Sequence, residues 1–418
     1  METVKAQKKL IFLFFLMYAS VLMGRMSYDA NIPSIIDYYG VTRAEAGLVG
    51  TFYLFASGIC QIFHAVFCKY YPKRYVLTGM LLISAVFNIL MFFRPPFWCI
   101  KYLWLLNGIS LSAFWSSMIL QFGESLDQSL MKWAVMSIGF SPLLANLLSY
   151  GGSALFSYAD IFHFSFLFSA ILLITIALIW FIFYNTLTPK RNDLWKEKSK
   201  AQDSPERKTI HFALIVLLMI CAILVISGCF VRDGIQIWMP SILTEQFGFD
   251  SSISRVLTLI LPLFGVFGSW LALWVNRRIK GFGAMVGLFF LCMSACLGGV
   301  LFSIRNNYMA ILLLLSAFTV CLGYAISQAL VAIMPLAMRD RINSGFLTGL
   351  MNSCSFIGVA AGNYGIGWIA DKAGWEYTIR VLFFVTSLSV LVAGVAMLFT
   401  FLQKKQELHN QTVERIEP

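Results

Sequence analysis

The sequence predicts an all-α membrane protein with 12 transmembrane helices, arranged as two pseudo-symmetric bundles of six helices each. Three observations predict this fold class. The chain is 59% hydrophobic and only 12% charged, whereas roughly a quarter of the residues in a typical soluble domain are charged. Long apolar runs recur along the chain, and a single polar segment divides them into two sets. Helices are expected because a membrane barrel would show short alternating segments instead.

The first bundle is predicted from six apolar runs, each long enough to cross a hydrocarbon core that about 20 helical residues can span. The first run lacks the small-residue cleavage site of a removable signal peptide, so we expect it to stay in the protein. The runs lie at 10–38, 44–68, 75–94, 99–123, 130–158 and 162–185.

The second bundle is predicted from the runs at 210–246, 252–276, 282–303, 308–337, 344–370 and 377–403. Between the two sets lies a highly charged segment that is poor in packing residues. We therefore expect one six-helix bundle at 1–186, a cytoplasmic linker at 187–209, a second bundle at 210–404 and a cytoplasmic tail at 405–418.

The two halves resemble each other. A shift of 207 positions superposes Arg25 on Arg232 and the Pro-Ser-Ile that begins at Pro33 on the one that begins at Pro240. Because this match coincides with the midpoint linker, it predicts a parallel repeat, as in transporters whose halves are related by an axis along the membrane normal.

Basic residues indicate how the chain crosses the membrane. If the amino terminus is cytoplasmic, 22 basic residues fall in inward-facing segments and 7 in outward-facing ones, including Arg43 and Arg255. The bias predicts that both termini are cytoplasmic. This accounting leaves only Arg25 and Arg232 within the membrane, and it gives no reason to expect nucleic acid as a partner.

These two arginines are the main candidate site. In GRMSYDANIPSI (24–35) and FVRDGIQIWMPSI (230–242), each lies eight positions before the shared proline, which predicts similar depths about 12 Å from that helix end. A cation at mid-bilayer is costly unless it lines water or has a partner. A guanidinium group suits carboxylate or phosphate oxygens, so we expect the two to face each other and share an anion; structural ion pairs are the alternative.

Two carboxylates complicate this prediction. Asp29 lies one turn beyond Arg25 on the same face, a spacing that allows an ion pair, whereas Asp233 is adjacent to Arg232 and is expected to point about 100° away, leaving Arg232 freer. With all four groups charged the site would be neutral. Three alternatives would let a neutral site bind an anion. Asp29 pairs with Arg25 only when the site is empty, or one of the acids carries a coupled proton, or the substrate carries an amine as well as an acid.

Further polar residues in the predicted helices are candidates for lining the site. Gln236 shares the face of Arg232 and is expected to contact substrate or to form an interhelical bond. His64 is a candidate proton carrier or anion contact, with a packed hydrogen-bonding role as the alternative. The remaining candidates, which could equally join helices, are Tyr324, Gln328, Asn352 and Gln61.

Several stretches resemble the major facilitator superfamily and, within it, the organophosphate:phosphate antiporter family. GRMSYDANIPSIIDYYGVTRAEAGLVGTFYLFASGICQIF resembles the family's first two helices, and CFVRDGIQIWMPSILTEQFGF its seventh. NSGFLTGLMNSCSFIGVAAGNYGIGWIADKAGW resembles the eleventh, ending at Asp371, Gly374 and Trp375. The resemblance implies that Arg25 and Arg232 bind phosphate.

Departures from that family pattern are equally specific. The gating motif between helices 2 and 3 is degraded, with Lys69 near its aspartate position. Where glycerol-phosphate transporters carry extra cations, this chain has Met26, Gln61 and Pro142. The resemblance therefore implies the fold and an anionic substrate, but it does not identify the substrate.

The predicted function is secondary active transport of a small organic anion, an organophosphate or a related compound, by alternating access. The alternatives are a proton-coupled symporter of carboxylates or zwitterions and a non-transporting ligand sensor. No nucleophile and base pair or metal motif is recognisable, so we expect no enzyme, cofactor or metal. We expect a monomer in the inner cell membrane, with the lipid bilayer and an anionic solute as its partners.

Overall fold

The computed structural model describes residues 2–67, 70, 72–188, 212–279, 281–338, 342 and 344–414, and among these residues no strand occurs. The predicted all-α class is confirmed. Residues 189–209 of the predicted linker lie outside the described residues, as do 415–418 of the predicted tail.

The described residues of the first half form nine helices, because several predicted runs break into two. Polar turns or prolines interrupt the runs at 10–38, 99–123 and 130–158, which become α1 with α2, α5 with α6 and α7 with α8. The helices are α1 (Glu2–Asp29), α2 (Ile32–Tyr39), α3 (Arg43–Phe67), α4 (Lys73–Phe92), α5 (Phe97–Leu111), α6 (Phe114–Ser125), α7 (Gln128–Gly139), α8 (Ser141–Tyr158) and α9 (Phe164–Leu187).

In the second half, fewer of the predicted runs break into separate helices among the described residues. The last two predicted runs form two helices, labelled together as α17, which meet at a sharp kink where Gly374 adopts a left-handed φ of 75°. The elements are α11 (Phe212–Phe247), α12 (Ser251–Thr258), α13 (Ile260–Asn276), α14 (Phe282–Arg305), α15 (Met309–Ser327), the π-helix η2 (Gln328–Ile333), α16 (Met334–Ala337) and α17 (Ser344–Glu414).

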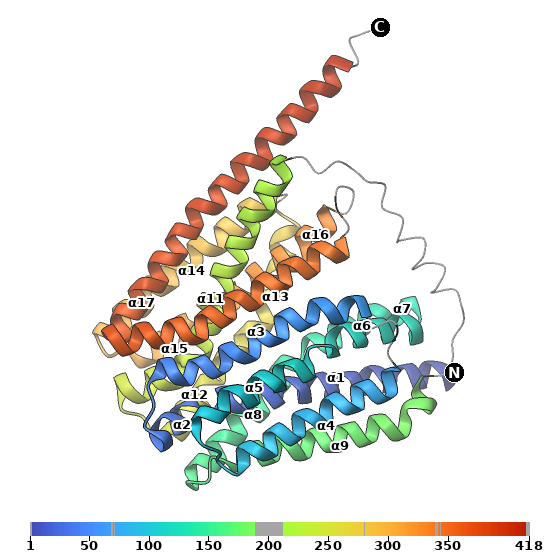
Figure 1. Cartoon of the computed structure of the whole chain (residues 1–418). Helices are drawn as coiled ribbons and strands as arrows, with labels where there is room; N and C mark the ends of the chain where they lie inside the picture. Colours follow the sequence, from blue (N-terminus) through green and yellow to red (C-terminus); the bar gives the residue numbers. More distant parts are fainter. Residues whose placement is uncertain are drawn as a thin grey trace.

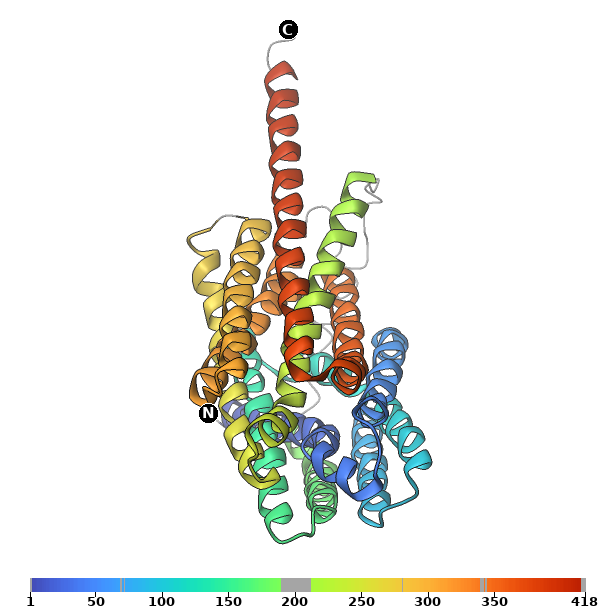
Figure 2. The same cartoon turned by 90° about the vertical axis from the view of Figure 1, so that its left-hand side faces the viewer.

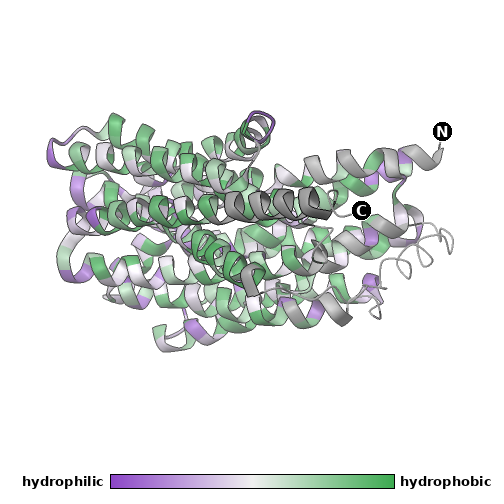
Figure 3. Ribbon diagram, turned by 90° about the horizontal axis from the view of Figure 1, so that it is seen from above, coloured by the Kyte–Doolittle hydropathy of each residue, from purple (hydrophilic) through white to green (hydrophobic). Residues whose placement is uncertain are grey.

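Eight helices or helix pairs of the described chain are long and apolar enough to span a membrane. One of the eight holds both halves of α17, and the runs realised as α3, α5 with α6, and α7 with α8 complete the predicted twelve. Apolar residues occupy most of each helix, whereas hydrophilic residues gather near helix ends (Figure 3).

The helices form two groups, one from residues 2–188 and one from 212–414, which lie on opposite sides of the molecule (Figures 1 and 2). We call the end at which α1 begins the α1 end, and the opposite end, where α3 begins, the Arg43 end. At the Arg43 end α2, α12 and the turn in α17 lie together, while toward the α1 end α11 and α17 diverge from α1, α4 and α9 (Figure 1).

Candidate functional site

Arg25 lies in the last two turns of α1 and is held loosely. Its Nε is 3.5 Å from Oδ2 of Asp29, one helical turn away, and its guanidinium carbon is 5.8 Å from the ring centroid of Tyr53 in α3. The Arg25 side chain is 16% exposed and that of Asp29 only 4%. Arg25 is therefore the member of this pair that solvent can reach.

Arg232 lies in the middle of α11 and is held tightly. Its Nε donates to Asp233 Oδ2 at 2.7 Å, one terminal nitrogen donates to the same oxygen, and the other donates to Ser327 Oγ at 2.8 Å. The ring of Tyr324 lies 4.4 Å from the guanidinium carbon. Four contacts thus surround this guanidinium group.

The expectation that Asp233 points away from Arg232 is wrong. Adjacent side chains leave a helix about 100° apart, but the arginine side chain is long enough to curl back along the helix surface to its neighbour. The carboxylate of Asp233 is the strongest partner of Arg232 in this structure.

The two arginines occupy one electrostatic region although they belong to opposite halves. Arg25 interacts electrostatically with Asp233 of the other half as well as with Asp29. Tyr324 likewise interacts with both Arg232 and Arg25. Within the described chain no ion pair joins Arg25 to the second half, so each cation is neutralised by an acid of its own half. The region carries two cations and two acids.

Gln236 joins the two halves instead of facing an open site. It is 5% exposed, and its Nε2 donates to Oδ1 of Asn146 in α8 at 3.1 Å. Of its two expected roles, the interhelical bond is the one this structure contains. Its Oε1 is buried and has no partner among the described residues.

Gln61 and Asn352 meet nearer the α1 end. Nδ2 of Asn352 in α17 lies 3.4 Å from Oε1 of Gln61 in α3. Gln61 is eight residues beyond Tyr53, which places it about 12 Å further along the helix. These two predicted site residues therefore form a second contact between the halves and do not touch either arginine.

The last two candidates are His64 and Gln328. Half-buried His64 is three positions beyond Gln61 on α3. Gln328 is the first residue of the π-helix that interrupts the α15 run, directly after the Ser327 that binds Arg232. Because π-turns concentrate at functional sites, this position fits a role in shaping the surroundings of Arg232.

Sequence reasoning missed three residues that hold the arginines and Gln236 in place, namely Tyr53, Ser327 and Asn146. Ser327 lies one helical turn beyond Tyr324, so the spacing between a predicted candidate and its neighbour could have indicated it. Tyr53 and Asn146 carry no such signal, because they meet their partners through contacts between separate helices.

The structure adds to the sequence accounting for Arg255, which counted it among the basic residues of outward-facing segments without expecting it to be buried. Arg255 of α12 is 0% exposed. Its Nε donates to the Ala30 carbonyl at 2.7 Å and a terminal nitrogen donates to Ser34 Oγ at 2.6 Å. The loop before α12 is short, so this arginine packs inward against the break between α1 and α2 rather than extending into solvent.

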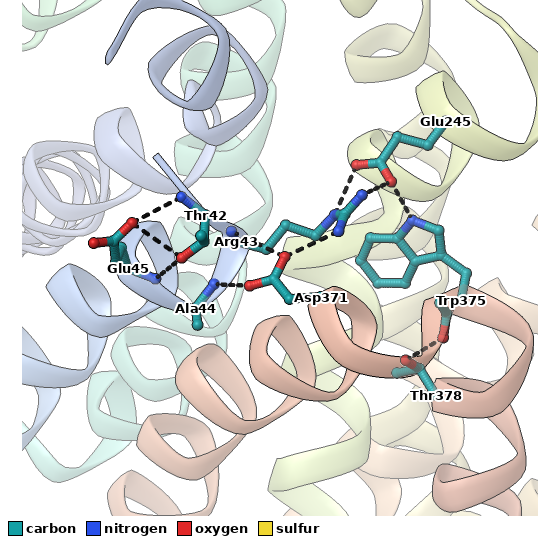
Figure 4. A network of polar contacts seen from close by, with 9 residues as sticks. Thr42, Arg43, Ala44, Glu45, Glu245, Asp371, Trp375 and Thr378 are labelled. Atoms are coloured by element: carbon teal, nitrogen blue, oxygen red, sulfur yellow. Dashed lines mark hydrogen bonds and ion pairs between the residues drawn. The ribbon is translucent and has the colours of Figure 1, made fainter. Parts of the chain in front are cut away.

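A network around Arg43 ties the two halves together at the Arg43 end (Figure 4). The Arg43 guanidinium binds Glu245 at the end of α11 and Asp371 of α17, with an Nη1 to Oδ1 distance of 2.9 Å to Asp371. Asp371 also accepts the backbone N–H of Ala44 at 2.8 Å, and Trp375 Nε1 donates to Glu245 at 2.7 Å. A carboxylate of the second half thus caps the amino terminus of α3 in the first half.

Close contact between the backbones of α3 and α17 also holds the two halves together near the Arg43 end. A Cβ added at Gly47 of α3 would lie 2.1 Å from the Asn363 carbonyl oxygen of α17, so only glycine allows the two helices to approach this closely. Thr51 Oγ1 donates to the Ala360 carbonyl at 2.8 Å, one turn further along. The structure therefore describes a conformer that is closed at the Arg43 end.

Comparison with known proteins shows which family profile and which relatives the chain matches. The profile described as Major Facilitator Superfamily matches residues 14–362. A glycerol-3-phosphate transporter of Bacillus subtilis (strain 168) is 23% identical over 394 residues, which cover 87% of this chain and 86% of that protein. A membrane sensor protein, UhpC of Escherichia coli (strain K12), is 26% identical over 91 residues, which cover 22% of this chain and 21% of the sensor.

Solved structures share the fold at low sequence identity. A bacterial homologue of the human lysosomal transporter Spinster, in an inward-facing and unoccupied conformation, superposes with a TM-score of 0.71 at 13% identity, covering 97% of this chain and 98% of that one. A D-xylose-proton symporter superposes with a TM-score of 0.69 at 12% identity, covering 92% and 96%.

Proposed function

The chain belongs to the Major Facilitator Superfamily, and we propose that it carries a small organic anion, an organophosphate or a related compound, across the membrane by alternating access. The coarser statement follows from the family: the protein is a multi-pass membrane transporter with a small-molecule substrate, and it is not an enzyme. The predicted resemblance to organophosphate:phosphate antiporters agrees with its similarity to a glycerol-3-phosphate transporter.

One observation carries the proposal. Two arginines, one from each half, reach a shared electrostatic region while remaining 16% and 11% exposed. A forked guanidinium group binds oxyanions with paired hydrogen bonds. An anion that displaces Asp29 and Asp233 from the arginines would connect the two halves, which ties occupancy of the site to their relative movement.

The topology completes the proposal. We place both termini in the cytoplasm of a cell whose inner membrane holds the protein, on the basis of its basic residues. The bundles at 1–186 and 210–404, the linker at 187–209 and the tail at 405–418 remain our proposed division, with the protein acting as a monomer. On this topology the Arg43 end is the outer one, and the closed network there makes the described conformer inward-facing.

Reconstituted protein tests the proposal directly. Proteoliposomes loaded with inorganic phosphate should exchange it for external labelled phosphate and for glycerol-3-phosphate or hexose phosphates. Arg25→Gln with Arg232→Gln provides the inactive control. Absence of exchange for every phosphate compound, with folded wild-type protein in the membrane, would reject an organophosphate substrate.

A proton-coupled symporter of carboxylates or zwitterions is the second candidate, because the site holds as many acids as cations. A zwitterion would match this balance by giving its acid to the arginines and its amine to Asp29 or Asp233. The test is uptake of organic acids and amino acids under a proton gradient. Uptake that depends on the gradient and loses its pH dependence in Asp29→Asn or Asp233→Asn would favour the symporter over the exchanger.

A ligand sensor is the third candidate, favoured only by the 91-residue similarity to membrane sensor proteins. It predicts that phosphate compounds raise the melting temperature of the purified protein while proteoliposomes show no flux. Flux of the same compounds would reject it.

A further inference from the structure

Arg255 lies at the interface between the two halves, closer to the Arg43 end than the central arginines. It projects from α12 of the second half onto the first half, where it binds the Ala30 carbonyl and Ser34 Oγ. Ala30 is exposed to this contact because α1 ends at Asp29 and α2 restarts at Ile32, ahead of Pro33. The broken helix leaves a carbonyl that an ordinary helix would bond internally.

The charge of Arg255 is poorly matched in this position. Its side chain is completely buried, and its Nη1 has no hydrogen-bond partner in the described part of the chain. No carboxylate forms an ion pair with it there; the exposed Asp37 interacts with it only at longer range. Burying a cation without a direct counter-charge is costly, so a structural role alone explains this residue poorly.

Neutral groups rather than acids bind the cation, and hydroxyl groups of α8 in turn contact those neutral groups. These hydroxyl groups lie on one face of α8, at the helical spacing of three and four residues. Ser153 Oγ donates to the Ala30 carbonyl that Arg255 also binds, and Ser157 Oγ is 3.4 Å from Ser34 Oγ. Ser149 Oγ is buried without a partner among the described residues. A cation among hydroxyl donors is a typical environment for an oxyanion.

Tyr150 connects this position to the central arginines. It lies on the same face of α8, is 2% exposed, and interacts electrostatically with Arg25, Asp29 and Asp233. It also interacts with Arg255. Ala30 is five residues beyond Arg25, a rise of about 7.5 Å along the helix direction. The two cationic positions are thus separated by roughly the length of a small solute.

We propose that Arg255 is a second oxyanion-binding station, between the central arginines and the Arg43 end. When the halves separate at that end, Arg255 leaves Ala30 and Ser34, and its freed donors, together with the hydroxyls of α8, receive the anion on its way to or from Arg25 and Arg232. This proposal rests on the proposed transport of an oxyanion. It adds a second binding site on the route between the central arginines and the Arg43 end.

The first experiment measures charge and water access without any substrate. Ser157→Cys is introduced into a variant whose native cysteines are replaced by serine, and the rates of reaction with an anionic and a cationic methanethiosulfonate reagent, added at the Arg43 side, are compared. The anionic reagent should react about tenfold faster, because the guanidinium attracts it. Arg255→Gln should remove this preference and Arg255→Lys should retain most of it, while Arg94→Gln, which removes an exposed cation at the same end, should leave it unchanged.

The second experiment measures inorganic phosphate exchange in right-side-out and inverted membrane vesicles. Arg255→Gln should raise KM about tenfold for phosphate supplied from the Arg43 side, because a charge-assisted contact is lost, and change KM less than about twofold from the α1 side. Wild-type exchange with equal effects of Arg255→Gln on both sides, or with none on either, would overturn the station and leave the proposed function intact.

The two experiments also separate the two proposals. If wild-type vesicles exchange no phosphate compound, the proposed function fails, and the labelling preference still decides whether Arg255 faces a water-filled route that attracts anions. Equal labelling rates for the two reagents would contradict the proposed second station, whether or not wild-type vesicles exchange phosphate. An unreactive Ser157→Cys in a variant that transports would contradict it as well.

Discussion

The regions around Arg25 and Arg232 begin from the same sequence pattern and end with different surroundings. Each arginine precedes a Pro-Ser-Ile by eight residues. Around Arg25 the contacts are long, 3.5 Å to Asp29 and 5.8 Å to the Tyr53 ring. Around Arg232 they are short, 2.7 Å to Asp233, 2.8 Å to Ser327 and 4.4 Å to the Tyr324 ring.

The helices that carry the two arginines differ in the same way. α1 stops at Asp29 and α2 restarts before Pro33, whereas α11 runs through Pro240 without a break for 36 residues. A proline removes one backbone hydrogen bond of a helix and leaves a carbonyl that needs another partner when it is buried. Ser153 and Arg255 satisfy Ala30 in the first half.

The difference teaches that the repeat preserves the position of the cation but not its partners. Arg232 is largely satisfied by its own half, so under the proposed function an anion that binds there has to displace Asp233 and Ser327. Arg25 is the more available cation. We therefore expect the first half to determine how readily an anion binds, and the second half to determine how firmly it is oriented.

Exchanging the forked group for a point charge should have the largest effect. Arg25→Lys and Arg232→Lys should each reduce phosphate exchange in proteoliposomes about 100-fold, because an ammonium group cannot make bidentate contacts. Arg232→Lys should also cost about 1–3 kcal/mol of stability, because Asp233 and Ser327 lose their partners, while Arg25→Lys should leave the unfolding temperature nearly unchanged. Near-normal exchange by both variants would remove the arginines from the site.

Displacing Arg232 without changing it should have the next largest effect. A Cβ at Gly323 would lie 2.5 Å from Arg232 Cβ, so Gly323→Ala should move the guanidinium away from Tyr324 and Ser327 and lower exchange roughly 30-fold. Gly79→Ala in α4 is the matched control, because an added Cβ there meets nothing within 4 Å. Equal activity of the two variants would mean that the position of Arg232 is unimportant.

Removing the competing acids should have the opposite effect and strengthen anion binding. Asp233→Asn should lower the Kd for inorganic phosphate about tenfold and Asp29→Asn about threefold, because the shorter ion pair competes more strongly with the anion. Calorimetric titration of purified protein measures both values. A larger gain in Asp29→Asn would reverse the assignment of Arg25 as the more available cation.

Removing a single neutral contact should have the smallest effect. Ser327→Ala should change the KM for phosphate by about threefold, since water can replace a hydroxyl at a partly exposed arginine. Tyr53→Phe, which keeps the ring near Arg25, serves as the matched variant in the first half and should change KM less than about twofold. A loss of exchange in Ser327→Ala comparable to that in Arg232→Lys would show that the hydroxyl does more than support Arg232.

Much of the architecture could be predicted from local sequence. Each apolar run carries enough information to indicate a membrane helix, because insertion depends on length and composition. The match between Arg25 and Arg232 also lies within short stretches. The same local reasoning could not predict the burial of Arg255, because that burial depends on Ala30 and Ser34, more than 200 positions away.

By itself, the sequence determined the all-helical membrane fold, the two related halves and the two arginines at matched positions, because hydropathy, charge and repeats are properties of consecutive residues. Only the tertiary structure decided that Asp233 curls back onto Arg232, that Gln236 binds Asn146 across the halves, and that Arg255 is buried beside a broken helix. These outcomes depend on which side chains meet after helices pack, and long flexible groups such as arginine choose among several partners only at that stage.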